Sequence, residues 1–110
     1  MQRETEEGYI IITCDFTGED WDGESPMIEG HQGSVVCAEA LLMAVEQAEP
    51  ATERTQCTMC LRHRDPPMKM WRHPAPPEKA NPDAVICWEC IKLADRTFAK
   101  DPDVEWEKRT

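Results

Sequence analysis

Two cysteine pairs, Cys57-Thr58-Met59-Cys60 and Cys87-Trp88-Glu89-Cys90, decide the fold of this chain. A Cys-x-x-Cys turn presents two sulfurs to one side of a metal ion, and two such turns complete the tetrahedral shell that zinc prefers. Four thiolates leave no coordination position for water, which is typical of a structural ion. The sequence therefore predicts one structural zinc ion per chain, bound by Cys57, Cys60, Cys87 and Cys90. We expect Arg62 and Lys92 to offset the negative charge of this centre.

The rest of the composition explains why the chain needs such a crosslink. It has four Trp, two Phe and one Tyr among 110 residues, against nine Pro and 31% charged residues. A core this small usually requires disulfides or a metal. The N-terminal segment is acidic and has no apolar signal region, so we expect a cytoplasmic protein without a membrane span. Thiols stay reduced in that compartment and are free to bind metal.

Periodicity and propensity predict an α+β fold. Residues 9–14 and 35–37 are rich in β-branched side chains and indicate strands, while residues 37–49 and 88–100 carry apolar side chains at helical spacing. In the second helix we expect a buried stripe made of Ile91, Leu93, Ala94 and Phe98. The other segments are predicted to be a disordered N-terminus (1–8), a linker (51–56), a proline-rich loop (65–82) and a tail (101–110) in which Val104 and Trp106 are able to dock.

Two stretches of the chain, residues 9–50 and 57–100, resemble each other. Val35-Val36-Cys37 before the first helix matches Val85-Ile86-Cys87 before the second, and Cys14-Asp15-Phe16-Thr17 matches the first cysteine pair. Thr17 and Ala40 stand where the second and fourth cysteines are expected. We therefore predict two tandem copies of one small zinc-stabilised unit, the first of them degenerate.

The degenerate copy raises the question of a second metal ion. Cys14 and Cys37 supply only two ligands, and zinc needs four. His31 is the candidate to complete a weaker site, with Asp15 as a further possibility. The alternative is that this copy has lost its metal and that packing or a hydrogen bond replaces it.

The second half also carries a family resemblance. Cys57-Thr58-Met59-Cys60, with the segment from Val85 to Leu93, resembles the N-terminal zinc-binding domain of the ClpX chaperone. The shared features are an apolar-Ile-Cys-x-x-Cys pair and a Glu before the last cysteine, where a helix begins. The resemblance covers about residues 57–98 and implies a treble-clef zinc fold that recognises adaptors and substrates and pairs with a second copy. That pairing implies either a homodimer or a monomer in which the degenerate half is the internal partner.

A cytidine-deaminase-like enzyme is one alternative. Cys37-Ala38-Glu39 followed by Cys57 and Cys60 offers three zinc ligands and a carboxylate that can shuttle protons. Residue 56, however, is Gln where such enzymes carry Pro, and this site leaves the second cysteine pair without a role. The sequence shows no nucleophile–base pair or phosphate-binding loop. We expect no enzymatic activity, and Glu39 suits the first turn of a helix through the helix dipole.

A nucleic-acid-binding zinc ribbon is the second alternative. Residues 61–80 carry five basic and two acidic side chains, and Trp71 is suited to stack on a base. The whole chain, however, has 12 basic against 22 acidic residues and a net charge of −10, which disfavours contact with phosphates. We expect an adaptor-like protein-binding module. Met and Trp suit adaptable interfaces, so the candidate contacts are Met68, Met70 and Trp71 in the loop.

Overall fold

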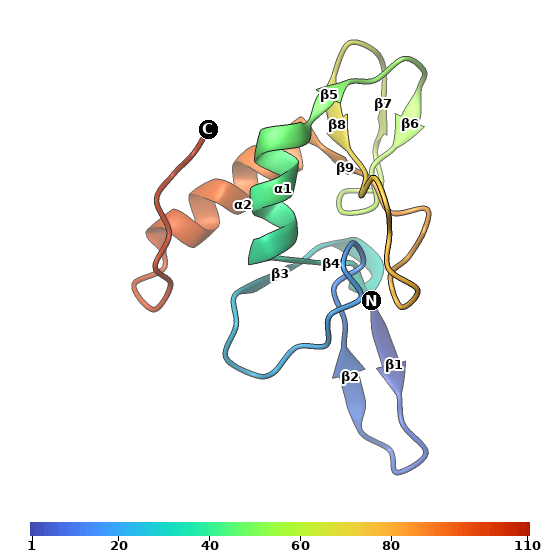
Figure 1. Cartoon of the computed structure of the whole chain (residues 1–110), viewed down its shortest axis with the longest axis vertical. Helices are drawn as coiled ribbons and strands as arrows, with labels where there is room; N and C mark the ends of the chain where they lie inside the picture. The colour runs from blue at the N-terminus through green and yellow to red at the C-terminus, as the bar shows by residue number, and fades with distance from the viewer.

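The computed structural model describes all 110 residues and confirms the α+β fold, with two helices and four small sheets. Helix α1 (Ala38–Gln47) and helix α2 (Trp88–Lys100) pack side by side (Figure 1). The strands are short: β1 (Gln2–Glu4), β2 (Ile10–Ile12), β3 (Met27–Glu29), β4 (Val35–Cys37), β5 (Glu49–Pro50), β6 (Thr55–Gln56), β7 (His63–Arg64), β8 (Lys69–Trp71) and β9 (Ile86–Cys87). A 3₁₀ turn, His31–Gly33, precedes β4. Neither helix is long and apolar enough to cross a membrane.

Both helices begin directly after a cysteine that ends a strand. Cys37 closes β4 and caps α1, where its sulfur accepts the backbone N–H of Ala40 at 3.5 Å. Cys87 closes β9 and stands at the N-cap of α2. The chain therefore passes from strand to helix at the cysteine itself, which fixes where each cysteine side chain points.

The buried face of α2 differs from the predicted stripe at one position. Ile91, Ala94 and Phe98 are buried as expected, but Leu93 is 53% exposed and Asp95 is fully buried in its place. The physical reason is the helical period, because residues 91, 94, 95 and 98 follow one face while residue 93 lies on the opposite side. The inclusion of Leu93 in the core was wrong.

The sheets place the cysteine turns next to the helix starts. β6 and β7 form an antiparallel pair around the turn at Cys57–Cys60, with Gln56 opposite His63. β8 lies between β5 and β9, and Met70 is opposite Cys87. Residues 51–56, expected to be a linker, thus contribute a strand to the hairpin that carries the first cysteine pair.

One core joins the two halves of the chain, and Trp71 lies at the join. Its ring centroid is 5.5 Å from that of Phe16, and its indole N–H donates to Gln47 Oε1 at 3.0 Å. The backbone N–H of His31 donates to Met59 O at 2.8 Å, which links the first half to the cysteine turn of the second.

The burial of Trp71 corrects the expected partner-binding loop. Trp71 and Met70 are only 3% and 8% exposed, since β8 is the central strand between β5 and β9 and both side chains belong to the buried cluster. Met68 is half-buried against the same core. These side chains therefore stabilise the fold and do not form the surface that the composition of the loop suggested.

The N-terminal segment is also more ordered than the sequence indicated. Residues 1–8 were expected to be disordered, but β1 pairs with β2 in an antiparallel ribbon. The ribbon extends away from the helices at one end of the molecule (Figure 1). Backbone pairing with the isoleucine-rich strand, which polar composition does not reveal, accounts for the difference.

The C-terminal tail docks on α2 through the buried carboxylate of Asp95. This carboxylate accepts hydrogen bonds from Trp106 Nε1 at 2.8 Å and from the backbone N–H groups of Arg109 and Thr110 at 2.9 and 2.8 Å. The Trp106 ring lies 5.1 Å from that of Phe98, so its docking is both polar and apolar. Burial by itself raises the pKa of Asp95, but hydrogen bonds from Thr110 and Trp106 outweigh it and hold the pKa below its usual value.

We predict that Asp95→Asn releases the tail, because an amide cannot accept all of these hydrogen bonds. Urea unfolding at neutral pH, followed by tryptophan fluorescence, is expected to show a loss of about 1–3 kcal/mol. Since the pKa is lower in the folded state, the carboxylate stabilises the fold above its unfolded pKa, and this contribution disappears as the pH falls through the folded pKa. The difference between variant and parent should therefore shrink in acid. The exposed Glu107→Gln is the control, and an equal loss in both variants would contradict the role of Asp95.

Candidate metal centre

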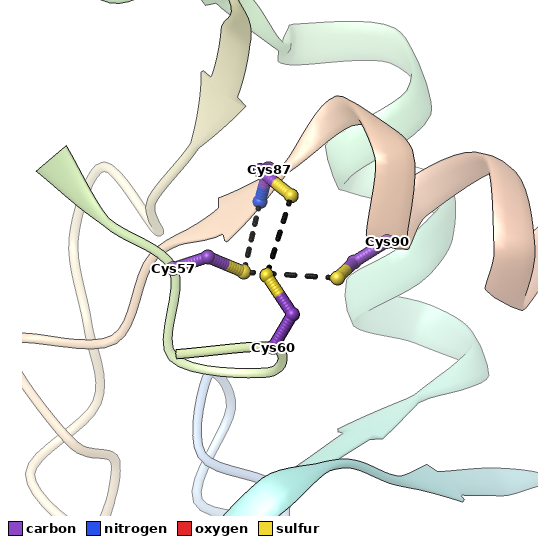
Figure 2. Close-up of side chains that lie close together, drawn as sticks. All are labelled: Cys57, Cys60, Cys87 and Cys90. Carbon is purple, nitrogen blue, oxygen red and sulfur yellow. Dashed lines mark hydrogen bonds between the residues drawn. The ribbon is translucent and has the colours of Figure 1, made fainter. Parts of the chain in front are cut away.

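Four cysteine sulfurs converge at the N-terminal end of α2. All four lie within 4.8 Å of one another, with 3.8 Å between the sulfurs of Cys57 and Cys90 and 3.9 Å between those of Cys60 and Cys87. Figure 2 shows the four side chains pointing toward a common centre from the turn, the end of β9 and the first turn of α2. A tetrahedral ion with Zn–S bonds of about 2.3 Å requires about 3.8 Å between sulfurs. The donor set and its spacing therefore fit a zinc ion.

Backbone hydrogen bonds position the first cysteine turn against β9. The sulfur of Cys57 accepts a hydrogen bond from the backbone N–H of Cys87 at 3.3 Å. The backbone carbonyl of Cys57 accepts one from the N–H of Leu61 at 2.9 Å. Thr58 donates its N–H to Val85 O at 2.7 Å, which extends the pairing toward β9. Leu61 has a φ of 64°, in the left-handed region that closes such a turn. These contacts hold the turn in place through the backbone and one sulfur.

The clustered thiols influence each other's protonation. Hydrogen bonds from Cys57 and Cys90 lower the pKa of Cys87, whereas hydrogen bonding to Cys57 and Cys87 raises the pKa of Cys90. One thiolate therefore forms readily and disfavours ionisation of its neighbours by repulsion. A divalent cation at the centre removes this repulsion, and its binding releases the remaining thiol protons.

Arg64 is the cation that contacts the sulfurs. Arg64 lies in β7, and its Nη2 donates a hydrogen bond to Cys60 Sγ at 3.9 Å. Its Nε is buried and has no hydrogen-bond partner. The predicted counter-charges are placed differently: the Lys92 ammonium lies 3.6 Å from Glu89, and Arg62 contributes its carbonyl oxygen to the N–H of Cys57. The sequence did not indicate this role of Arg64, because only the pairing of β6 with β7 brings its side chain to the turn at Cys57–Cys60.

The first half repeats these backbone contacts around Cys14. The sulfur of Cys14 accepts the backbone N–H of Cys37 at 3.4 Å, and its carbonyl accepts the N–H of Gly18 at 2.9 Å. Asp15 donates its N–H to Val35 O at 2.9 Å. Gly18 has a φ of 74°, the same left-handed conformation that Leu61 has in the second half. When Cys14 is aligned with Cys57 and Cys37 with Cys87, each of these three hydrogen bonds has its equivalent at the four-cysteine centre.

No second metal group forms in the first half. The Thr17 hydroxyl lies 3.6 Å from Cys37 Sγ, and the residue aligned with the fourth cysteine is the fully buried Ala40. His31 is exposed and belongs to no cluster of metal-ligating side chains, so the structure does not bring it to Cys14 and Cys37. The Cys37 thiol and Thr17 beside Cys14 lower the pKa of Cys14 to about 6. The predicted second ligand set is therefore not assembled, and a contact between Thr17 and Cys37 and the buried Ala40 occupy the positions concerned.

The residues of the deaminase-like alternative are also separated. Cys57 and Cys60 share their cluster with the second cysteine pair and not with Cys37. Glu39 is exposed on the first turn of α1, as its helix-dipole interpretation requires. The structure therefore does not bring this carboxylate and a three-ligand zinc site together.

Comparison with models of known protein families, with curated proteins and with solved structures finds no match to this chain. The four-cysteine cluster is therefore the feature of this chain that bears most directly on its function.

We predict that Arg64→Gln weakens zinc binding by about tenfold, because groups that contact metal ligands typically affect affinity by this order. The measurement is competition for zinc with a colorimetric chelator. Arg62→Gln is the matched control, since its side chain is exposed and only its backbone carbonyl supports the turn. Equal zinc affinity in the two variants would show that Arg64 does not stabilise the thiolate centre.

Proposed function

We propose that this chain is a protein-binding module whose fold is held together by one structural zinc ion. The observation that carries the proposal is the convergence of four cysteine sulfurs at the spacing of a tetrahedral zinc centre. Four sulfurs fill the coordination shell, which supports a structural ion over one that activates water. On this reading the module has no enzymatic activity of its own.

We further propose that the second half is a treble clef similar to the zinc-binding domain of ClpX. Its supporting features are the order of elements along the chain: a cysteine turn within the β6–β7 hairpin, the pairing of β8 with β9, and a helix that begins at the second cysteine pair. The resemblance in sequence lies in the same region. Recognition of adaptor proteins or substrates is the role that this likeness supports.

The first half, in this proposal, is a metal-free copy of the same unit that pairs with the second half inside one chain. The matched hydrogen bonds around Cys14 and Cys57 support a common origin of the two turns. The packing of α1 against α2 and the contact between Phe16 and Trp71 provide the pairing surface. A zinc domain that pairs with its own degenerate copy has no need of a second chain.

Charge and burial favour a protein partner over nucleic acid. Residues 1–50 carry twelve acidic side chains and one basic side chain, Arg3, so half of the molecule repels phosphates. The base-stacking candidate, Trp71, is buried, and Lys69 from the basic loop lies 4.7 Å over the ring of Trp88. Part of the positive charge of the loop is therefore committed to contacts within the fold, through Arg64 at Cys60 and Lys69 at Trp88.

Native mass spectrometry of the chain purified without chelator is expected to show a monomer with one zinc ion. Cys90→Ser removes one ligand and is expected to lose the ion and the folded state, because structural zinc supplies about 10 kcal/mol or more of folding free energy. Cys14→Ser is the matched control and should keep one zinc ion. Partner capture from cell extract, with crosslinked contacts mapped onto the chain, should require the zinc-bound form. Zinc in the Cys90→Ser chain, or nucleic acid as the captured material, would contradict the proposal.

The tandem-copy proposal predicts that a second zinc site can be restored. In the double variant Thr17→Cys/Ala40→Cys, the new thiols take the positions aligned with Cys60 and Cys90, next to the existing Cys14 and Cys37. We expect two zinc ions per chain by native mass spectrometry. The variant Thr17→Ser/Ala40→Ser matches the substitutions in size and should bind only one. A cysteine variant that folds and still binds one ion would show that the two turns are not equivalent.

A further inference from the structure

We propose that the β1–β2 ribbon is the docking surface for a lysine- or arginine-rich extended segment of a partner protein, which adds as a strand to the outer edge of β1. This inference rests on the proposed protein-binding function and assigns to it a surface and a partner chemistry. Four observations carry it: a free strand edge, exposed apolar side chains, acidic side chains around them, and the position of the ribbon away from the cysteine cluster.

The outer edge of β1 has no partner strand. β1 pairs only with β2, and Thr5 donates its backbone N–H to Tyr9 O at 2.8 Å. Because hydrogen-bonded positions alternate in an antiparallel pair, the backbone groups of Gln2 and Glu4 point to the other side. All three residues of β1 are exposed. Unpaired backbone groups on such an edge are the template for strand addition by a peptide.

Exposed apolar side chains gather on the same ribbon. Tyr9 and Ile10 are each 68% exposed, and Trp21 is 45% exposed. The backbone N–H of Trp21 donates to Ile12 O at 2.7 Å, which places Trp21 beside Ile12 and on the same face as Ile10. Three of the four large exposed hydrophobic side chains of the chain thus lie on or beside this ribbon, with Tyr9 on the face opposite to Ile10, whereas the fourth, Leu93, is alone on α2. Apolar side chains grouped in this way mark an interaction surface.

The surrounding charge selects the partner. Glu4, Glu6 and Glu7 are exposed on β1 and in the turn that follows it. The one basic side chain of this half, Arg3, is already paired with Asp20 at 2.9 Å. A second copy of the chain or a nucleic acid brings more negative charge to this surface and is repelled, while a basic segment is attracted and oriented. Glu4 lies opposite Ile10 and therefore on the same face of the ribbon. Lysine or arginine on that face of an added strand meets the acid and lays its aliphatic stem along Ile10. The alternating apolar side chains then fall on the opposite face, where Tyr9 lies.

The ribbon is separated from the zinc centre, so partner binding at the ribbon does not interfere with metal binding at the cysteines. It extends from the body of the molecule at the end of its 45 Å long axis (Figure 1). A two-stranded ribbon alone is marginally stable in water. A third strand is therefore expected to order it further, which makes the ribbon a recognition element that the zinc-stabilised core only has to hold in place.

The test uses the zinc-loaded full chain labelled with ¹⁵N and a peptide in which lysine alternates with valine. We expect chemical shift changes confined to the ribbon and to Asp20–Trp21, with an affinity that falls as salt is added. A peptide with glutamate in place of lysine should not bind. Glu4→Lys and Ile10→Thr should each weaken the peptide about tenfold, while Leu93→Thr should bind as the parent does.

The outcomes separate this inference from the function on which it rests. Unchanged resonances at the cysteine centre in the Glu4→Lys and Ile10→Thr variants show that the core has folded. Shift changes elsewhere, equal binding of both peptides, equal affinity of the Leu93 and Ile10 variants, or no binding would overturn the ribbon as the docking surface. Crosslinked partner contacts at another surface would also overturn it, but they would leave the protein-binding function standing. Loss of zinc-dependent partner capture altogether would defeat the proposed function itself.

Discussion

The convergence of four cysteine sulfurs on one point is the constraint on which the rest of this structure depends. Sulfurs from the turn at Cys57–Cys60, from the end of β9 and from the first turn of α2 share a space in which all lie within 4.8 Å. Such proximity is favourable for thiolates only around a cation, and four sulfurs at this spacing fit zinc. Once the centre forms, it fixes the hairpin, the strand and the helix start together. The short strands and the proline-rich loop then need little stability of their own.

The same backbone arrangement exists in the first half with only two cysteines, Cys14 and Cys37. There the hydroxyl of Thr17 faces the sulfur of Cys37. The buried Ala40 stands at the position that Cys90 has in the second half. Small, buried side chains allow α1 to pack on α2, and Phe16 and Trp71 complete the core between the halves. We interpret the first half as stabilised by its packing on the second, so that one four-cysteine cluster can suffice for a chain with so few aromatic residues.

Stability and recognition occupy different parts of the molecule in this interpretation. The cations Arg64 and Lys69 are near the cysteine turn and Trp88, where they contact groups of the fold. The acidic side chains and the exposed Tyr9 and Ile10 are in the half without the metal cluster. Because the charge is divided in this way, the acidic half presents a surface that would attract a basic partner, while Arg64 contacts the cysteine cluster.

Local chemistry determined what can be recognised from the sequence alone. The spacing of the cysteines predicted the cluster, the 3.6-residue period predicted both helices within two residues, and β-branched runs predicted β2 and β4. These features depend on neighbours along the chain, which the sequence contains. Only the tertiary structure decided the burial of Trp71, the exposure of Leu93, the pairing of β1 and the contact of Arg64 with Cys60. Each of these depends on which distant segment lies opposite, and that is set by packing and strand register, which no local pattern specifies.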